Sequence, residues 1–359
     1  MNKFIVLLFL AFSFSYTSSQ SSLNKTIPEL VESNIENSSF RQDSISKLLR
    51  LIQETPHKDF RGLVVIEKNK IVIEQYYNTF WQISVHDIRS AGKSITAMLL
   101  GIAMKQGLVE SLEQDVYSFF SKEKYPTLHE DLKKVKLKHL LDMASGLDAD
   151  TDNTETSGHA VHWMAKDDWK PYILSVPQIS PPGKRWVYAD INALLIGAII
   201  EEKSGLSLKD YAQQHLFDPL GIKQVYWYTN ASNQTGAAGN LYISALDFAK
   251  LGLLISNKGK VGNEQIISQN YIEQLSNKTL DLTEVFGTPT SYGMFWYKSS
   301  KTLQGETIDY LYASGNGGNH LVVIPEKEIV IALTSSAYGP GYGQGRSYAI
   351  WDMLLESFK

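Results

Sequence analysis

The chain contains no cysteine among its 359 residues. This absence excludes a disulfide framework, thiol catalysis and a lipid-modified cysteine. Basic blocks are also missing, since 34 Lys and Arg stand against 38 Asp and Glu and the net charge is −4. A balance of this kind gives no reason to expect nucleic acid as a partner. With 43% hydrophobic and 20% charged residues, the composition is that of a soluble globular protein.

Two sequence motifs of common enzyme classes are absent or broken. No Gly-x-Ser-x-Gly occurs, which disfavours a hydrolase with a nucleophile elbow and a Ser-His-Asp triad. Gly92-Lys93-Ser94 ends like a phosphate-binding loop, but Asp87 stands where that loop needs its first glycine. A nucleotide site is therefore not expected.

The N-terminal apolar run, from Phe4 to Phe14, is too short to span a bilayer. Lys3 precedes it and small residues follow it, as in a cleaved signal peptide. We predict a signal peptide over residues 1–20, with an uncleaved anchor as the alternative, and export to the periplasm or the extracellular space. Residues 21–42 are polar and are predicted to be a linker. No membrane span is expected after cleavage.

The remaining residues, 43–359, are predicted to form one domain with strands at both ends and helices between them. Two β-branched runs, 62–66 and 71–77, form a predicted hairpin, and strands return at 292–297, 311–313, 321–324 and 329–333. Helices are predicted at 43–53, 90–106, 191–203, 207–216, 245–255, 268–275 and 347–358, and a glycine-rich stretch, 339–345, as a flexible loop. The pattern indicates an α+β fold, with a sheet part at about 43–89 and 285–359 and a helical part at about 90–284.

Ser90 and Lys93 lie at the start of the predicted apolar helix. Residues three apart share one face of a helix, so the two side chains can meet, and the hydroxyl lies at the positive end of the helix dipole. This is the Ser-x-x-Lys arrangement of penicillin-recognising serine enzymes. Serine is a poor nucleophile until a second group takes its proton. The pair therefore needs a partner elsewhere in the chain.

Tyr188 is the candidate for that partner. It follows a Pro-Pro-Gly turn and precedes a helix that Asp190 is predicted to cap. Lys93 can serve as the base if burial and the helix dipole disfavour its ammonium form. Alternatively, a charged Lys93 stabilises a phenolate at Tyr188, which then acts as the base. The sequence leaves both alternatives open.

These segments together resemble the class C β-lactamase-like serine hydrolases. Tyr188-Ala189-Asp190 is similar to their Tyr-x-Asn motif, and the stretches 139–147, 237–240 and 313–319 look like further family segments in the family's order. The resemblance extends from about residue 45 to the C-terminus. It implies a β-lactamase/transpeptidase-like fold, in which an antiparallel sheet is flanked by helices and a mostly helical domain is inserted.

The resemblance also implies roles for individual residues. Ser90 would be the acylated nucleophile, Lys93 its proton partner and Tyr188 the general base and then acid. The backbone N–H groups of Ser90 and Asn319 would form the oxyanion hole. Asn316, Gly317 and Gly318 would line the opposite wall of the substrate site, with Asp190 near Lys93.

Two positions depart from the β-lactamase pattern. Asn316 stands where those enzymes carry a lysine that binds the substrate carboxylate, and Asp190 replaces an asparagine beside Lys93. The residues of these motifs are more similar to those of the esterase and 6-aminohexanoate-dimer hydrolase branch. We therefore predict a serine hydrolase that cleaves a small-molecule ester or amide through an acyl-enzyme on Ser90. The alternatives are a β-lactamase or peptidoglycan DD-peptidase, and a penicillin-binding or sensor protein without turnover.

The stretch 148–172 carries two further candidate features. His159 and His162 lie among aspartates with the spacing of metal ligands, but solvated loop residues are the preferred interpretation, and we predict no metal or cofactor. Trp163, Trp169 and Tyr172 make the stretch a candidate substrate lid, with packing alone as the alternative. The sequence does not indicate an oligomeric state.

Overall fold

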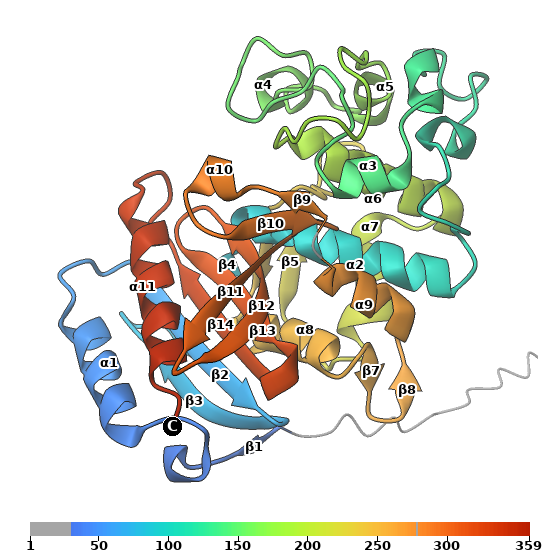
Figure 1. Ribbon diagram of the computed structural model, residues 1–359. Coiled ribbons are helices and arrows are strands. Elements are labelled where there is room, and N and C mark those ends of the chain that lie inside the picture. Colours follow the sequence, from blue (N-terminus) through green and yellow to red (C-terminus); the bar gives the residue numbers. More distant parts are fainter. Residues whose placement is uncertain (1–29, 278) are drawn as a thin grey trace, which may run out of the picture.

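The computed structural model describes residues 30–277 and 279–359, so the predicted signal peptide lies outside the described residues. A large sheet forms one part of the molecule, and a group of helices forms the other (Figure 1). Helix α2 (Gly92–Lys105), which carries Lys93, runs between the two parts. The residue pair singled out in the sequence therefore lies at their junction.

The large sheet brings together strands from both ends of the described chain. Its order is β1 (Val31–Glu32), β3 (Lys70–Tyr76), β2 (Phe60–Glu67), β14 (Ile329–Ser335), β13 (Asn319–Ile324), β12 (Glu306–Gly315), β11 (Trp296–Leu303), β10 (Thr290–Gly293) and β9 (Leu280–Asp281). Neighbouring strands are antiparallel except β1 and β3. The predicted α+β fold with an antiparallel sheet is confirmed.

Helices cover both faces of this sheet. Helices α1 (Gln42–Glu54) and α11 (Tyr342–Glu356) lie on the outer face, and α8 (Ala245–Ser256) and α2 lie on the inner face (Figure 1). Along β13, Leu321 and Val323 belong to the inner core and Val322 and Ile324 to the outer core. Because side chains alternate along a strand, a continuous apolar run fills both cores.

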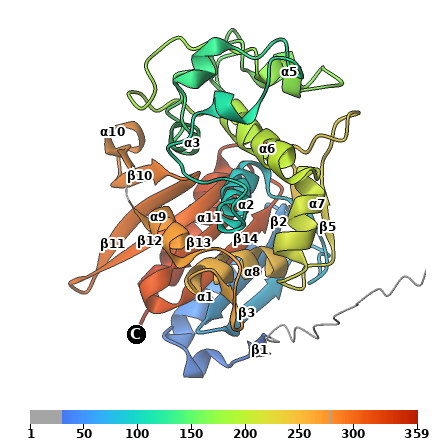
Figure 2. The same cartoon turned by 90° about the vertical axis from the view of Figure 1, so that its right-hand side faces the viewer.

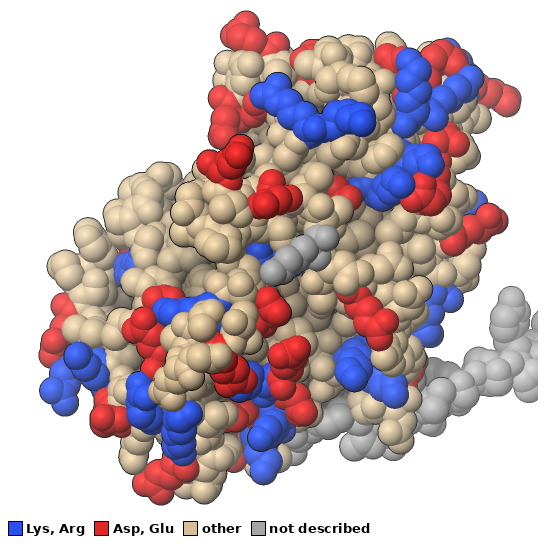
Figure 3. Space-filling model, in the orientation of Figure 1, with Lys and Arg blue, Asp and Glu red and all other residues tan. Residues whose placement is uncertain are grey.

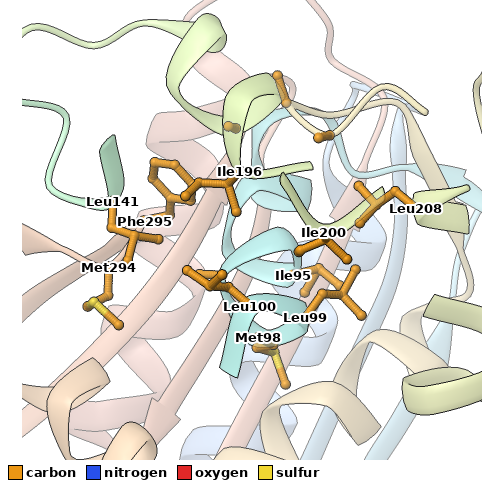
Figure 4. Packing of buried hydrophobic residues seen from close by; sticks show 14 of the residues in the cluster. Ile95, Met98, Leu99, Leu100, Leu141, Ile196, Ile200, Leu208, Met294 and Phe295 are labelled. Carbon is orange, nitrogen blue, oxygen red and sulfur yellow. The ribbon is translucent and has the colours of Figure 1, made fainter. Parts of the chain in front are cut away.

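The helical part packs around α2, whose residues from Gly92 to Ala103 are all buried. Ile95 and Leu99 of α2 lie close to Ile200 of α6 (Asp190–Ser204), and Ile196 lies beside Phe295, in the core shown in Figure 4. The other short helices are α3 (Leu137–Leu141), α4 (Ala160–Trp163), α5 (Lys170–Ile173), α7 (Leu208–Ala212), α9 (Gln269–Ser276) and α10 (Thr283–Phe286). Figure 2 shows α3, α5 and α6 above the sheet, with α2 viewed nearly along its axis below them.

Two small sheets complete the described part of the chain. Strands β4 (His86–Asp87), β6 (Leu241–Ile243) and β5 (Val225–Trp227) form one, and β7 (Lys260–Val261) and β8 (Glu264–Gln265) form the other. The short strands β5 and β6 were not predicted. Strand β4 leads directly into the turn that carries Ser90, so this small sheet helps to position the candidate nucleophile.

Three local predictions are wrong. The predicted strand 292–297 is a hairpin, because Met294 and Phe295 adopt positive φ angles of 56° and 60° between β10 and β11. The predicted loop 339–345 already contains the start of α11 at Tyr342. The predicted linker is part of the fold from residue 31, since β1 pairs with β3 and Phe40 is buried.

Asp142 connects the helical part to the β10–β11 hairpin. Its carboxylate accepts a hydrogen bond of 3.1 Å from the Met294 N–H group. Burial raises the pKa of Asp142 to about 6, although the nearby Lys298 opposes this. Burial lowers the pKa of Lys298 to about 8, and its ammonium group donates to Asn277 O at 2.6 Å and Gly293 O at 3.1 Å.

We expect Asp142→Asn to change how stability depends on pH. The pKa of Asp142 is higher in the folded than in the unfolded state, so its contribution to stability is present below pH 3.8 and is lost as the pH rises through about 6. Asparagine does not titrate. The free energy of unfolding of the variant minus that of the wild type should therefore increase by about 2–3 kcal/mol between pH 4 and pH 7.

Chemical denaturation at a series of pH values measures this difference. Asp43→Asn is the matched control, because Asp43 is an exposed carboxylate in the first turn of α1. A difference that stays flat for Asp142→Asn across this pH range would contradict the prediction.

The charges on the surface are mixed in sign. On the face shown in Figure 3, Lys and Arg side chains alternate with Asp and Glu side chains. In the described part of the chain, no helix has both the length and the apolar character needed to cross a membrane.

Candidate active site

Ser90 lies in a short 3-10 turn, Arg89–Ala91, which continues directly into α2. The residue before it, Arg89, has a positive φ of 51°. Non-glycine residues in this region are strained, and such strain persists where the surroundings hold it in place. Here the holding group is Asp87, which accepts from the Arg89 N–H group at 2.8 Å and from the Asn240 side chain at 3.1 Å.

Lys93 is almost completely buried, at 1% exposure, and its ammonium group is surrounded by oxygen atoms. It lies 3.1 Å from Ser90 Oγ, 2.8 Å from Ala238 O and 2.7 Å from Asp190 Oδ1. The contact with Ala238 is possible because Gly239 approaches the helix start closely. A Cβ atom at Gly239 would lie 3.0 Å from Arg89 O. The predicted meeting of Ser90 and Lys93 on one helix face is therefore observed.

The surroundings of Lys93 decide its charge. Burial alone would lower the pKa of Lys93, but the Asp190 carboxylate and the Tyr188 hydroxyl outweigh burial and raise it. The ammonium form is thus favoured at neutral pH. Of the two alternatives left open by the sequence, this geometry favours a charged Lys93 that assists a second base.

Tyr188 and Asp190 reach Lys93 from the start of α6. Lys93 Nζ lies 4.9 Å from the centre of the Tyr188 ring. Asp190 is the first residue of α6, but its side chain makes no capping hydrogen bond and is paired with Lys93 instead. The prediction that Asp190 caps the helix is wrong, because the buried ammonium group competes for the carboxylate.

The segment 313–319 approaches Ser90 through Gly315 and Asn316. A Cβ atom at Gly315 would lie 1.9 Å from Ile88 O, so only glycine allows β12 to come this close to the turn that carries Ser90. Asn316 follows directly and lines the same cavity as Ser90. Its side-chain oxygen accepts from the Gly339 N–H group at 2.8 Å.

The structure does not bring the other residues of this segment to the cavity. Gly317 lies against Tyr338 and Gly318 lies against Gly343 of α11, so both glycines allow close packing and neither lines the cavity next to Ser90. Asn319 is fully buried at the start of β13, where its amide group bonds to Asn316 O at 2.9 Å and to the Ser335 N–H group at 3.0 Å. Asn319 therefore does not line the cavity, and the role of its backbone N–H group at the oxyanion stays a prediction.

The cavity beside Ser90 has a volume of about 500 Å³. The residues that line it are Arg89, Ser90, Trp163, Met164, Trp169, Asp190, Tyr228, Gly236, Ala238, Gly239, Asn240, Asn316, Tyr338 and Gly339. The candidate lid 148–172 contributes three of them. Tyr172 instead donates its hydroxyl hydrogen to Ser157 O at 2.9 Å, within the same segment.

His159 and His162 stabilise this segment. Their Nε2 atoms lie 3.1 Å from Thr151 O and 2.9 Å from Thr154 O, and His159 also caps α4. Among residues 30–277 and 279–359, no cluster of three or more His, Cys, Asp or Glu side chains is arranged to hold a metal ion.

Sequence reasoning missed several residues of the site. Asp87 was noted only as a break in a phosphate-loop pattern, yet it fixes the backbone before Ser90. Tyr338 donates its hydroxyl hydrogen to Asp87 O at 2.8 Å from a loop far along the chain. The stretch 237–240 was identified only by its resemblance to a family segment. In the structure, the carbonyl oxygen of Ala238 accepts a hydrogen bond from Lys93.

We expect Asp190→Asn to lower the pKa of Lys93, because burial would then act without the opposing carboxylate. Asparagine keeps an oxygen toward the ammonium group, so the fold should be retained. If activity needs the ammonium form, the alkaline limb of the kcat/KM profile moves to lower pH by about one unit or more.

The profile is measured with a p-nitrophenyl ester between pH 6 and pH 11. Glu284→Gln, a change at an exposed position of α10, is the control. An alkaline limb at the same pH in Asp190→Asn and wild type would show that the charge on Lys93 does not govern activity.

Several known proteins are similar to this chain in fold or in sequence. A 6-aminohexanoate-dimer hydrolase, provisionally assigned, from Bacillus anthracis has the same fold, with a TM-score of 0.73 and 19% identity over 92% of this chain and 87% of that one. The N-acetylmuramyl-L-alanine amidase of Bacillus subtilis is 24% identical over 231 residues, which are 59% of this chain and 52% of the amidase. The ML-236A carboxylate methylbutanoyltransferase of Penicillium citrinum is 28% identical over 149 residues, 38% of this chain and 35% of that enzyme.

The solved structure from Bacillus anthracis shares the fold of this chain. The Beta-lactamase family profile matches residues 48–355, and the chain belongs to this family. The resemblance seen in the sequence is thus confirmed. The chain spans about half the length, or less, of the curated relatives it matches.

Proposed function

We propose that the protein hydrolyses an ester or a small amide through an acyl-enzyme on Ser90. The observation that carries the proposal is the buried cluster beside the cavity, in which Lys93 contacts Ser90, Asp190 and Tyr188. A pure binding protein has no need of a charged lysine that contacts both a serine and a phenol. Such a cluster is what nucleophilic catalysis requires.

Tyr188 acts as the base, and Lys93 remains an ammonium group throughout. As a phenolate, Tyr188 takes the proton of Ser90 while Oγ bonds to the substrate carbonyl carbon. Tyr188 then gives this proton to the departing alkoxide or amine, and the acyl group stays on Ser90. A water molecule attacks the acyl carbon, Tyr188 takes its proton, and Ser90 regains a proton as the carboxylic acid leaves.

The negative charge of the tetrahedral intermediates needs two N–H donors. The Ser90 N–H group is one, as the sequence predicted. We assign the second to Asn316 in place of Asn319, because Asn316 lines the cavity while Asn319 is buried in β13. Donors of this kind contribute about 3–4 kcal/mol each to transition-state stabilisation.

Two related activities stand beside ester and amide hydrolysis. Asn316 carries no charge, whereas β-lactamases and peptidoglycan peptidases have a carboxylate-binding lysine at this position. This difference argues against β-lactams and peptidoglycan peptides as substrates. The similarity to a methylbutanoyltransferase supports acyl transfer to an alcohol as the second candidate. In that reaction an alcohol replaces water in the second step. We further propose that the protein is exported, on the basis of the predicted signal peptide.

Labelling with a fluorescent phosphonate and turnover of p-nitrophenyl acetate test the proposal together. Labelling of the peptide that contains Ser90, with turnover, supports hydrolysis. Labelling without turnover supports a sensor, and release of p-nitrophenol that depends on added alcohol supports acyl transfer. Nitrocefin hydrolysis at a rate similar to that of the ester would overturn the preferred substrate class.

A further inference from the structure

One wall of the cavity beside Ser90 is built from large apolar side chains. Trp163 and Met164 come from the end of α4, Trp169 from the residue before α5, and Tyr228 from the residue after β5. Met164 is 52% exposed and Tyr228 is 39% exposed, although both are large and apolar. Apolar side chains that remain exposed around a cavity mark a binding surface.

The aromatic rings of this wall are held rigidly against one another. The Trp163 and Trp169 ring centres lie 5.1 Å apart at an interplanar angle of 78°, and Trp169 lies 6.3 Å from Tyr228. The backbone of Trp169 donates to the Gln234 side chain at 2.6 Å, and Gln234 donates in turn to Asp168 at 2.5 Å. The segment 148–172 is thus fixed to the segment that follows β5, so the wall is formed before a substrate arrives.

The two tryptophans form the buried part of this wall, and Met164 and Tyr228 are the wall residues that remain most exposed to the cavity side. Trp163 and Trp169 are 5% and 3% exposed, and neither indole N–H group has an acceptor among the described residues. The rest of the cavity is lined by polar groups, among them Arg89, Asn240 and Asn316. The apolar wall is therefore the part of the cavity that can stabilise an apolar group of a substrate that reacts at Ser90.

We infer that the substrate carries an aromatic or branched apolar group beside its scissile bond, and that this group packs on the wall formed by Met164 and Tyr228 and supported from behind by Trp163 and Trp169. The inference rests on the proposed function, because it names the class of ester or amide that the same site takes. A cavity of about 500 Å³ has room for a phenyl-sized group together with the reacting carbonyl.

Two series of esters test the inference. One compares p-nitrophenyl acetate with p-nitrophenyl phenylacetate, and the other compares the acetates of ethanol and of 2-phenylethanol. We expect kcat/KM for the phenyl member to be at least tenfold higher in one of the series, and Trp163→Ala or Trp169→Ala to reduce that preference about tenfold. Trp163→Phe keeps a ring without the unpaired N–H group and should retain most of the preference.

Trp81→Ala is the matched control, because Trp81 is 71% exposed on a loop and does not line the cavity. Wild-type protein that turns over p-nitrophenyl acetate but prefers the phenyl member in neither series would overturn the inference and leave the proposed function intact. Folded Trp→Ala variants that keep the full preference would also overturn it.

A binding measurement covers the case in which the proposed function itself fails. Calorimetric titration of Ser90→Ala protein with the same pairs of esters needs no turnover. Tighter binding of a phenyl member, weakened in the double variant with Trp169→Ala, supports the inference. Equal binding of both members in each pair contradicts it.

Discussion

Replacing Ser90 by alanine is expected to reduce kcat for ester hydrolysis by a factor of about 10⁴ or more. Without the hydroxyl, no acyl-enzyme forms, and only the weak background from substrate binding and the oxyanion donors remains. The same variant should take up no phosphonate label. Stopped assays with p-nitrophenyl acetate, together with mass spectrometry of the labelled protein, measure both effects.

The fold should tolerate this change. Ser90 Oγ is an oxygen neighbour of Lys93, but the contacts of Lys93 with Ala238 O at 2.8 Å and Asp190 at 2.7 Å do not involve it. Loss of activity at unchanged thermal stability therefore reports on chemistry. Retained hydrolysis in Ser90→Ala would show that another residue is the nucleophile.

Ser94→Ala is the matched control for a serine in the same helix. Ser94 Oγ donates to Phe295 O at 2.6 Å in a buried contact between α2 and the β10–β11 turn. Its loss leaves a buried carbonyl without this donor and should cost about 1–3 kcal/mol of stability. Activity below the unfolding temperature should remain. The two serines thus separate a catalytic hydroxyl from a structural one.

The periodic parts of the chain were predictable from sequence, because burial imposes their pattern. The hairpin of β2 and β3 and the helices α1, α2, α6, α8 and α9 were predicted within a few residues. The turn at Met294 and Phe295 was missed because neither is a typical residue for positive φ. Strands β5 and β6 have only three residues each, too few for a recognisable alternation.

In the candidate site, local contacts were predictable and long-range ones were not. Ser90 and Lys93 share one helix face, so their contact follows from spacing alone. The partner of Asp190 is 97 positions away, and only the resemblance to the β-lactamases, not the local spacing, placed Asp190 near Lys93. Asn319 was assigned to the oxyanion by order in the chain. The turn geometry that brings Asn316 to the cavity is visible only in three dimensions.

Tyr188→Phe is expected to lower kcat by a factor of about 10²–10⁴. The substitution removes the oxygen that accepts the Ser90 proton and keeps the ring. Contacts of the ring, such as those with Lys93 at 4.9 Å and Trp186 at 6.0 Å, should persist. Lys93 keeps Asp190 and Ala238 O as partners, so its charge and position should also persist. A substitution of Lys93 is a less clean test, because it leaves the carboxylate of Asp190 without its cation.

The pH dependence of Tyr188→Phe decides between the two bases. If Tyr188 accepts the proton, the variant should lose kcat by the factor given above, and its kcat/KM profile should differ in shape from that of the wild type. If Lys93 accepts it, the variant should retain kcat within tenfold and show the wild-type profile. The raised pKa of Lys93 favours the first outcome, because an ammonium group paired with Asp190 has no lone pair with which to accept a proton. Burst kinetics of p-nitrophenol release show in addition whether acylation, deacylation or both steps depend on the phenol.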